Sequence, residues 1–398
     1  MKQRSLVLFL GLLISGAYHV FSQTTRVNRP AVVKERDFVI YQDAQYYSAF
    51  PSLVVRPDGE ILCAFRRAPD RRALWQAPGT THTDPNSYLV LVRSRDQGKS
   101  WTKDPELIFA HPLGGSQDPC MTQLRDGSIV CTSYGWALLP AGTAERLKAT
   151  LSHPPFAFLG GYLLRSENGG KSWKGPFIPP TVPGDQTLDA LDHPIPAYNR
   201  GAMIQRRDGS LLWAVAANVA PINRQSSVHL LKSSDRGETW QYICPIAQDD
   251  KVQFNETSLV ETQKGDILAF LRTDKLEGRL AYARSTDGAK SFQPWQDSRF
   301  FGFPSQAVRL KDGRIFLVYG YRQKPFGIRG RLINPDGTDI SEAKEIILRQ
   351  DGGNGDLGYP WASLLSDGRI LVAYYFNQED GNRHIAGSLF SLRSSETP

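Results

Sequence analysis

The chain has 398 residues, of which 40% are hydrophobic and 22% are charged, a balance typical of globular proteins rather than of disordered or collagen-like chains. Its 35 glycines and 26 prolines indicate many turns, and therefore many short strands rather than long helices. The formal charge of +7 is spread along the chain without a dense basic block, so the sequence predicts no nucleic-acid partner.

The N-terminal residues have the pattern of an export signal. Lys2 and Arg4 precede an apolar run over residues 6–14, and we expect cleavage after Ser22. The apolar run is too short to span a bilayer comfortably, although a short membrane anchor is the alternative. We therefore expect a signal peptide at 1–22, a secreted or periplasmic protein, and a single domain at 23–398 with no membrane span in the mature chain.

Six later segments repeat one pattern, an apolar strand, a glycine turn and a second apolar strand. The turn glycines are Gly59, Gly127, Gly209, Gly265, Gly313 and Gly368. Most of them follow an aspartate, and Asp-Gly between β-rich runs is a strong hairpin signal because the turn needs positive φ. The spacing of roughly 50 to 80 residues is typical of one four-stranded blade per repeat. The sequence thus predicts an all-β fold, a six-bladed β-propeller, whose last blade is completed by the β-rich run at 36–42.

A second motif, Ser-x-Asp-x-Gly-x-Ser/Thr-Trp, follows four of the hairpins. Its central positions are Asp96, Asn168, Asp235 and Asp287, and residues 334–337 form a degraded copy. In such a turn the carboxylate accepts backbone N–H bonds, the glycine supplies positive φ and the aromatic residue packs beneath. We expect these turns to be structural and to lie far from the chemistry.

The residues that begin the innermost strands of a propeller face one shared cleft. In this chain the corresponding residues are Ala49, Asp118, Arg200, Glu256, Phe303 and Tyr359. Two carboxylates, an arginine and a tyrosine therefore converge although they are far apart in the sequence. This convergence indicates a candidate site at one end of the central channel.

The turn motif resembles the Asp-boxes of the sialidase superfamily, and the resemblance extends from Phe38 to Phe390. It implies a catalytic glutamate before a strand and an arginine at the end of the next one, which Glu256 and Arg272 match. It also implies a tyrosine nucleophile at the start of the last blade, matched by Tyr359. A tyrosine suits a sugar acid because a carboxylate nucleophile would be repelled by the substrate's own carboxylate. The structural alternatives are a turn-bonding carboxylate for Glu256 and a buried aromatic ring for Tyr359.

The family's acid/base is an aspartate in the loop before the first Asp-box. The stretch Asp84-Pro85-Asn86-Ser87 resembles that arrangement, so the resemblance assigns the acid/base role to Asp84. Asp70 and His82 are rival candidates, and a structural turn aspartate is the alternative.

The family also clamps the sugar carboxylate with three arginines, since the planar guanidinium pairs bidentately with carboxylates. Arg272 matches the second of them. Arg322 matches the third, with Arg329 as a rival, whereas the first position is occupied by Ala49.

The missing first arginine leaves several replacements open. Arg66 or Arg67 on the following strand, or Arg200 from the third repeat, are the candidates, and Asp118 is a further candidate substrate-binding residue. The alternative for each arginine is a solvated strand end. Equally, the substrate need not be a standard sialic acid.

The chain contains four cysteines. Cys120 and Cys131 flank a predicted hairpin, which makes a cross-strand disulfide possible in an oxidising compartment, while Cys63 is expected to be a buried thiol. No pair has zinc-site spacing, and the sequence predicts no metal and no cofactor.

The leading functional hypothesis is an exo-glycosidase of the sialidase type, which hydrolyses a terminal acidic 2-keto sugar with retention. Its partner would be a glycan that ends in an acidic sugar, and a modest positive field would suit such a substrate. One alternative is a propeller glycosidase or lyase that acts on polysaccharides containing uronic acid. The other is a non-catalytic glycan-binding propeller.

Overall fold

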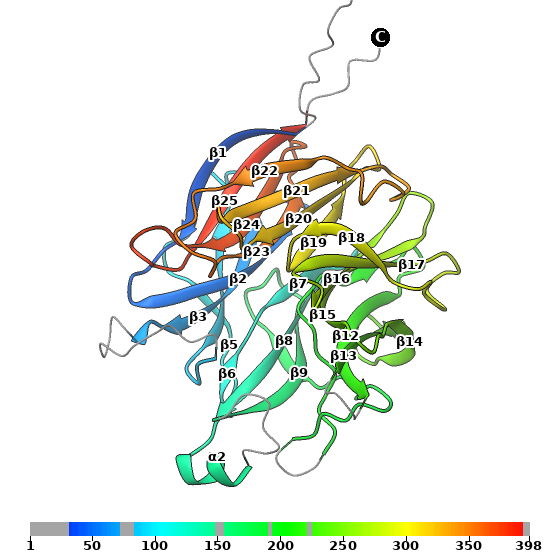
Figure 1. Ribbon diagram of the computed structural model, residues 1–398. Coiled ribbons are helices and arrows are strands. Elements are labelled where there is room, and N and C mark those ends of the chain that lie inside the picture. Colours follow the sequence, from blue (N-terminus) through cyan, green and yellow to red (C-terminus); the bar gives the residue numbers. More distant parts are fainter. Residues whose placement is uncertain (1–31, 72–82, 148–154, 190–192, 221–224, 393–398) are drawn as a thin grey trace, which may run out of the picture.

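The computed structural model describes residues 32–71, 83–147, 155–189, 193–220 and 225–392. The expected signal peptide lies outside these residues, as does His82. The described chain is almost entirely β-structure, with one described helix, α2 (Ala141–Leu147), at the lower edge of Figure 1. None of the described helices is long and apolar enough to span a membrane.

Six antiparallel sheets form the blades of the predicted propeller, and each sheet follows one hairpin repeat. Blade 1 contains β2 (Tyr46–Val55), β3 (Ile61–Pro69), β4 (Tyr88–Ser94) and β5 (Glu106–Phe109). Blade 2 contains β6 (Gly115–Ser116), β7 (Cys120–Gln123), β8 (Ile129–Leu138), β9 (Phe156–Ser166) and β10 (Lys174–Phe177). Blade 3 contains β11 (Ile204–Gln205), β12 (Leu211–Ala220), β13 (Gln225–Ser233) and β14 (Gln241–Ala247).

The remaining blades complete the ring. Blade 4 contains β15 (Gln253–Glu261), β16 (Ile267–Asp274), β17 (Arg279–Ser285) and β18 (Gln296–Phe301). Blade 5 contains β19 (Ser305–Arg309), β20 (Ile315–Tyr321), β21 (Gly327–Ile333) and β22 (Glu345–Arg349). Blade 6 contains β23 (Gly358–Leu364), β24 (Ile370–Phe376), β25 (His384–Leu392) and β1 (Val32–Tyr41). In Figure 1 the inner strands β2, β7, β15, β19 and β23 gather at the centre.

The predicted closure of the ring is confirmed, because β1 pairs antiparallel with β25 and becomes the outermost strand of blade 6. One expectation needs refinement. Blade 2 has five strands rather than four, since its innermost strand is divided into β6 and β7 by the segment that contains Asp118 and Pro119. Proline has no backbone N–H to give to the ladder, which accounts for a break at this point.

Buried apolar side chains hold neighbouring blades together. Six clusters of them lie between adjacent blades, and one unites Leu53 and Val92 of blade 1 with Leu371 and Leu389 of blade 6. Strands buried on both faces supply these cores, which is why the second strand of each repeat begins with a continuous apolar run. The ring is therefore closed by packing as well as by the pairing of β1.

The Asp-box turns lie beside the hairpin turns, at the end of the propeller opposite the strand starts. In blade 1, for example, Ser94 at the start of the box pairs with Ile61, just after the hairpin turn. Asp96 accepts hydrogen bonds from the backbone N–H groups of Lys99 and Ser100, at 3.0 and 2.9 Å. The bond from the N–H four residues on recurs at Asn168, Asp235 and Asp287, and Asp287 also repeats the bond from the N–H three residues on.

The degraded fifth copy keeps this geometry, with Asn334 accepting from the N–H of Thr338 at 3.1 Å. The aromatic residues of the boxes pack on the blade cores, as expected, and they are Trp101, Trp173, Trp240 and Phe292. The expectation of structural turns is thus confirmed.

Candidate active site

The inner strands of three blades are irregular at the residues that the sequence placed at the channel. The register shifts lie between Ala49 and Ser52, Phe254 and Thr257, and Gly358 and Trp361. Such bulges re-aim side chains and are frequent next to active sites. Phe50 and Tyr359 also have positive φ, 59° and 51°, a costly conformation for bulky residues. The backbone is therefore distorted at the positions where Glu256 and Tyr359 enter the channel.

Tyr359, Glu256 and Arg272 form one hydrogen-bonded cluster. The Tyr359 hydroxyl donates to Oε1 of Glu256 at 2.7 Å. Nη1 of Arg272 donates to Oε2 of Glu256 at 2.6 Å and to the Tyr359 hydroxyl at 3.1 Å. Cross-strand pairing of β15 with β16 brings Glu256 and Arg272 together, and β23 of blade 6 supplies Tyr359 from across the channel.

The electrostatics of this cluster fit a nucleophile and its base. Burial would raise the pKa of the Glu256 carboxyl, but Arg272, the Tyr359 hydroxyl and Arg200 together lower it below its usual value. Burial, followed by the charge of Glu256, raises the pKa of Tyr359 well above its usual range. At neutral pH the tyrosine therefore keeps its proton and presents it to an ionised carboxylate, the starting arrangement for general-base activation.

Arg322 lies beside this cluster from blade 5, where the resemblance placed it. Its guanidinium carbon is 5.4 Å from the centre of the Tyr359 ring and 5.9 Å from that of Phe303. Arg272 shares the Phe303 ring, at 5.0 Å. Nη1 of Arg322 and Nη2 of Arg272 donate to no group in the described part of the chain. Two guanidinium edges are therefore available to an anionic ligand.

Sequence reasoning missed the side chains that hold Arg322. Nη2 of Arg322 donates to the Tyr375 hydroxyl at 3.0 Å, and this hydroxyl donates to Asp356 at 3.0 Å. Asp356 also accepts from Tyr47 at 3.1 Å and from Nε of Arg383 at 2.9 Å. The only available signal was the position of Asp356, three residues before the tyrosine that begins the last blade. These contacts come from blades 1 and 6, so no single repeat reveals them.

Arg200 lies beneath Tyr359 and is almost fully buried. Its Nη2 donates to the carbonyls of Tyr359 and Pro51, at 3.1 and 3.3 Å. Its guanidinium carbon is 4.8 Å from the centre of the Tyr359 ring and 5.5 Å from that of Trp361. Arg200 thus supports the strained backbone at Tyr359, whereas its Nε and Nη1 are buried without a hydrogen-bond partner.

Asp118 is the second carboxylate of the site. It is only 2% exposed, and its Oδ2 accepts from the Tyr134 hydroxyl at 3.3 Å while Oδ1 has no partner. Burial first, and then the charge of Glu256, raise its pKa to about 7, against the opposing effect of Arg200. Two carboxyl groups with different pKa values therefore lie at one end of the channel, as acid/base chemistry requires.

The two arginines of β3 point to different places. Arg66 faces Ala49 in the β2–β3 register and is fully buried, with its guanidinium 5.6 Å from the Tyr47 ring. Arg67 instead forms an ion pair with Asp43 at 3.2 Å and covers the Tyr46 ring at 3.5 Å. Of these two, Arg66 is the one next to the position of the missing first arginine.

The candidate acid/base residues lie on the blade-1 side. Asp84 is buried and accepts two hydrogen bonds from Arg71, at 2.6 and 2.9 Å, and one from the N–H of Asn86. Asp70 is also buried. No contact in the described chain joins either carboxylate to the Tyr359 cluster, while His82 lies outside the described residues.

The structure does not favour two other expectations, Arg329 as a substrate-binding residue and a disulfide between Cys120 and Cys131. Arg329 is 3% exposed, donates to the carbonyl of Arg349 at 2.7 Å and lies 3.5 Å from Glu345, so blade 5 itself occupies its guanidinium. The possible disulfide is not formed, because Cys120 and Cys131 are both free buried thiols. Their strands pair one residue out of step, with Met121 facing Cys131. Cys63 is a buried thiol, as predicted.

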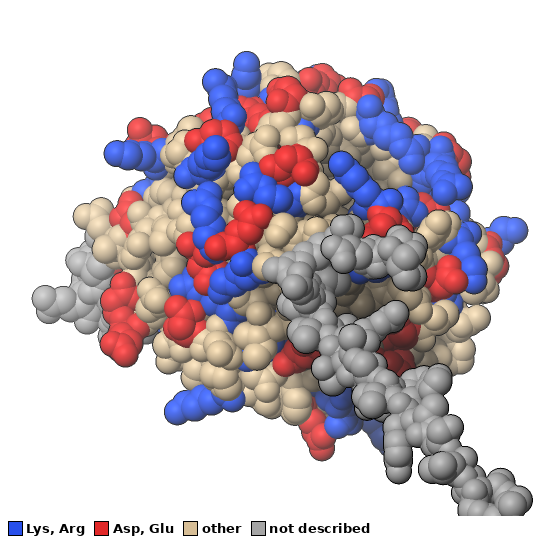
Figure 2. All heavy atoms as spheres, turned by 90° about the horizontal axis from the view of Figure 1, so that it is seen from above, with Lys and Arg blue, Asp and Glu red and all other residues tan. Residues whose placement is uncertain are grey.

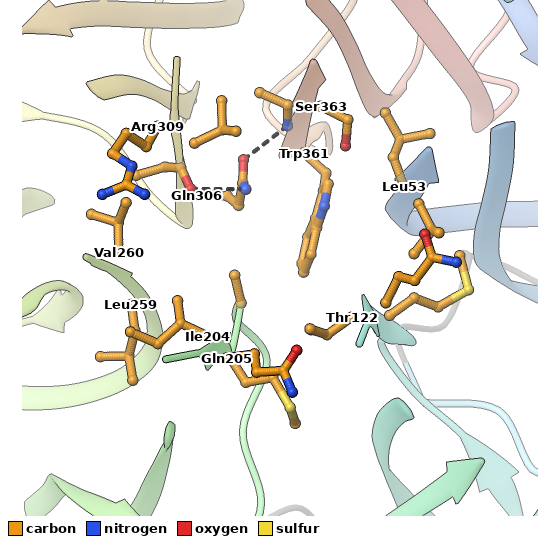
Figure 3. Close-up of a pocket in the computed structure, with 18 of the residues that line it drawn as sticks. Leu53, Thr122, Ile204, Gln205, Leu259, Val260, Gln306, Arg309, Trp361 and Ser363 are labelled. Carbon is orange, nitrogen blue, oxygen red and sulfur yellow. Dashed lines mark hydrogen bonds between the residues drawn. The ribbon is translucent and has the colours of Figure 1, made fainter. Parts of the chain in front are cut away.

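The central channel is hollow on the side of the hairpin turns. A cavity of about 460 Å³ lies there, and all six innermost strands line it (Figure 3). Its wall combines apolar residues such as Leu259 and Trp361 with amides such as Gln205 and Gln306. The Tyr359 cluster is not part of this lining, and Arg200 lies between Tyr359 and Trp361. The candidate site and the cavity are therefore separate features of one axis.

No dominant charge marks the side of the molecule shown in Figure 2, where acidic and basic side chains are interleaved. Among the described residues, no group of three or more His, Cys, Asp or Glu side chains is arranged to hold a metal ion.

Comparisons with known proteins agree with this architecture. A protein of unknown function from Dyadobacter fermentans is 52% identical, with a TM-score of 0.88 over 92% of this chain and 100% of the other. A sialidase from Streptococcus pneumoniae is 13% identical, with a TM-score of 0.62 over 90% of this chain and 70% of the other. An α-L-arabinanase from Penicillium chrysogenum is 14% identical, with a TM-score of 0.62 over 91% of this chain and 99% of the other.

Comparison with curated protein sequences gave no match. The distant structural neighbours share the propeller fold with this chain, since identities this low establish a fold rather than an activity. The family model of the BNR repeat-like domain matches residues 156–372, more than half of the chain, from β9 of blade 2 to β24 of blade 6. The chain therefore belongs to the BNR repeat-like domain family and is a sialidase-like six-bladed propeller.

Proposed function

We propose that this protein is a retaining exo-glycosidase of the sialidase type, which removes a terminal acidic 2-keto sugar from a glycan. The observation that carries the proposal is the 2.7 Å hydrogen bond from the Tyr359 hydroxyl to Glu256, with Arg272 bonded to both. The sialidase and arabinanase among the structural neighbours are glycosidases by name, which supports the broader class of reaction.

The chemistry follows from the cluster. The Tyr359 oxygen attacks the anomeric carbon as its proton passes to Glu256, and the glycosidic bond breaks with a proton donated to the leaving oxygen. Water, deprotonated by the residue that had donated the proton, then attacks the anomeric carbon from the face that the leaving group vacated, opposite Tyr359. The tyrosine oxygen leaves and takes its proton back from Glu256, so two inversions retain the configuration. Asp84 is the donor that the family resemblance assigns. The free edges of Arg272 and Arg322 would hold the sugar carboxylate.

A second candidate is a glycosidase or lyase for polysaccharides that contain uronic acid. It is favoured by Ala49, which is buried at the position where the sialidase pattern has its first arginine. Two accessible arginines rather than three would fit a sugar whose carboxylate is attached at a different position from that of a sialic acid.

Released-sugar analysis separates these candidates. The protein would be incubated with sialylated and with uronic-acid-containing oligosaccharides, and the first anomer released would be identified by proton NMR. Release of the α-anomer of a sialic acid or related 2-keto acid supports the proposal. Release of an unsaturated or saturated uronic acid alone replaces it with the second candidate, and no release from any acidic glycan favours a binding propeller.

We also propose that residues 1–22 direct export, so that the enzyme meets its glycan outside the cytoplasm. Mass spectrometry of the protein recovered from the periplasm or medium would detect cleavage after Ser22. An intact N-terminus on the exported protein would contradict this.

A further inference from the structure

Four aromatic side chains form a group beside the candidate active site. Trp136 and Phe158 lie 4.6 Å apart, Phe158 and Tyr198 4.5 Å, and Tyr198 and Tyr134 5.6 Å, measured between ring centres. All four are partly exposed, and none belongs to the six apolar clusters between the blades. The group, called the aromatic platform below, is therefore partly exposed and lies outside the cores between the blades.

Local backbone chemistry fixes the platform. β9 carries Gly160 and Gly161, and a Cβ at Gly161 would meet the carbonyl oxygen of Ala197 at 2.0 Å. The absence of side chains lets the segment that ends in Tyr198 lie directly against β9, with the N–H of Gly161 bonded to the carbonyl of Pro196 at 3.1 Å. Tyr198 is thus held against Phe158, at the end of blades 2 and 3 that carries the candidate site.

The platform is continuous with the site. The Tyr134 hydroxyl donates to Asp118 at 3.3 Å, and the charge of Glu256 acts on both Tyr134 and Tyr198, whose pKa values are raised chiefly by burial. The accessible edges of Arg272 and Arg322 come from blades 4 and 5, whereas the platform belongs to blades 2 and 3. A ligand whose carboxylate meets these arginines can therefore extend over blades 2 and 3.

We propose that the aromatic platform binds a neutral sugar ring on the leaving-group side of the bond that the enzyme cleaves. The proposal rests on the proposed function and adds the part of the substrate beyond the acidic sugar. The C–H groups of a pyranose face carry partial positive charge and pack on the negative face of an aromatic ring. None of the four side chains is charged, which favours a neutral sugar over an acidic one.

The tyrosine hydroxyls provide the polar contacts that a sugar needs. The Tyr198 hydroxyl makes no hydrogen bond with any described residue, and that of Tyr134 has lone pairs left after donating to Asp118. An apolar partner such as a lipid chain would leave these groups without partners. Small-molecule sites are usually lined by apolar and aromatic side chains, with a few polar groups that fix the orientation of the ligand.

Binding is tested without catalysis by saturation-transfer NMR with lactose as the neutral probe. Trp136→Leu and Tyr198→Leu keep apolar volume but remove the rings, and Phe301→Leu alters an exposed aromatic residue on β18 as the matched control. We expect lactose affinity to fall about fivefold to tenfold in the first two variants and to stay unchanged in the third. Equal affinity in all the variants, or an equal loss in all three, would overturn the proposal.

A kinetic comparison separates this proposal from the proposed function. For Trp136→Leu, kcat/KM on a trisaccharide that ends in the acidic sugar should fall by a similar factor, whereas the fluoride of the same sugar, which has no leaving-group ring, should be hydrolysed at the wild-type rate. Equal losses on both substrates would contradict a leaving-group subsite. If no acidic substrate is cleaved at all, the proposed function fails, while the lactose result still decides whether the platform binds sugar.

Discussion

The two ends of this propeller are built from the same repeat, yet they differ in almost every physical property. At the end that carries the hairpins and Asp-boxes, the same residues recur and their hydrogen bonds are satisfied locally. Hydrogen bonds from the side chain and backbone of Ser291 lower the pKa of Asp287, whose side chain is exposed.

At the opposite end, six equivalent strand starts carry six different residues. Charges are buried there, the pKa of Asp118 is raised, Arg200 keeps unpartnered donors, and Phe50 and Tyr359 have strained backbones. Repetition thus accompanies stability, and divergence at equivalent positions accompanies the candidate chemistry. Four substitutions, two of them paired with a control variant, test this contrast.

The largest expected effect is that of Tyr359→Phe, which removes the proposed nucleophile and one hydrogen bond. We expect kcat to fall by at least about a thousandfold, since each 1.36 kcal/mol of lost transition-state stabilisation is about tenfold in rate. The measurement is kcat on the substrate identified by released-sugar analysis, with thermal unfolding as the check on folding.

The matched control for Tyr359 is Tyr319→Phe in blade 5. Tyr319 is also buried, donates to Glu345 at 3.0 Å and accepts from Arg331 at 3.2 Å, so it repeats the tyrosine–glutamate–arginine pattern away from the channel. It should lose stability without losing turnover per folded molecule. A Tyr359→Phe variant with near-wild-type turnover would sink the proposed mechanism.

Arg322→Ala should weaken binding of the acidic sugar about 10- to 100-fold, because one charge-assisted contact to the ligand is lost. Arg329→Ala is the comparison, and it should lower the unfolding temperature while leaving affinity unchanged, since blade 5 occupies that guanidinium. Calorimetric titration of both variants with the released sugar checks the assignment. The reverse result would move the clamp to Arg329.

Asp118→Asn tests the electrostatics of the buried end through pH. The unfolded-state pKa of an aspartate is about 3.9, whereas burial and Glu256 raise that of Asp118 to about 7. Its contribution to stability is therefore fully present below pH 4 and is lost as the pH rises to about 7. In denaturant unfolding, the free energy of unfolding of the asparagine variant should rise relative to that of wild type by up to about 2 kcal/mol between pH 5 and 7. A constant difference over this range would mean that Asp118 titrates normally.

The smallest effect is expected at the other end. Asp235→Ala removes the bonds to the N–H and hydroxyl of Thr239, at 2.9 and 2.5 Å, and should lower the unfolding free energy by about 0.5–2 kcal/mol. Activity per folded molecule should persist. Lost activity in a variant of normal stability would show that the two ends are coupled.

Much of the site could be predicted because Glu256, Tyr359, Arg200 and Asp118 occupy strand starts that the repeat makes visible, while the family resemblance pointed to Arg272 and Arg322 near strand ends. Glu256, Arg272, Tyr359, Arg322, Arg200 and Asp118 all lie at the end of the propeller that the sequence indicated. Asp356, Tyr375 and the aromatic platform were not foreseen. They lie in connections or at strand ends, and nothing local distinguishes them from ordinary turn and core residues.

The number of blades, the closing strand and the place of the repeated turn geometry could be derived from the sequence, because hairpins and Asp-boxes depend on residues close together in the chain. Which charges meet could be seen only in the folded molecule. Arg67 and Arg329 are occupied by Asp43 and by the carbonyl of Arg349, whereas Arg272 and Arg322 keep an edge free. A long side chain is directed by partners that are distant in the sequence, on a neighbouring strand of the same blade for Arg329 or on another blade for Arg322, and these partners come close only once the sheets have paired and the ring has closed.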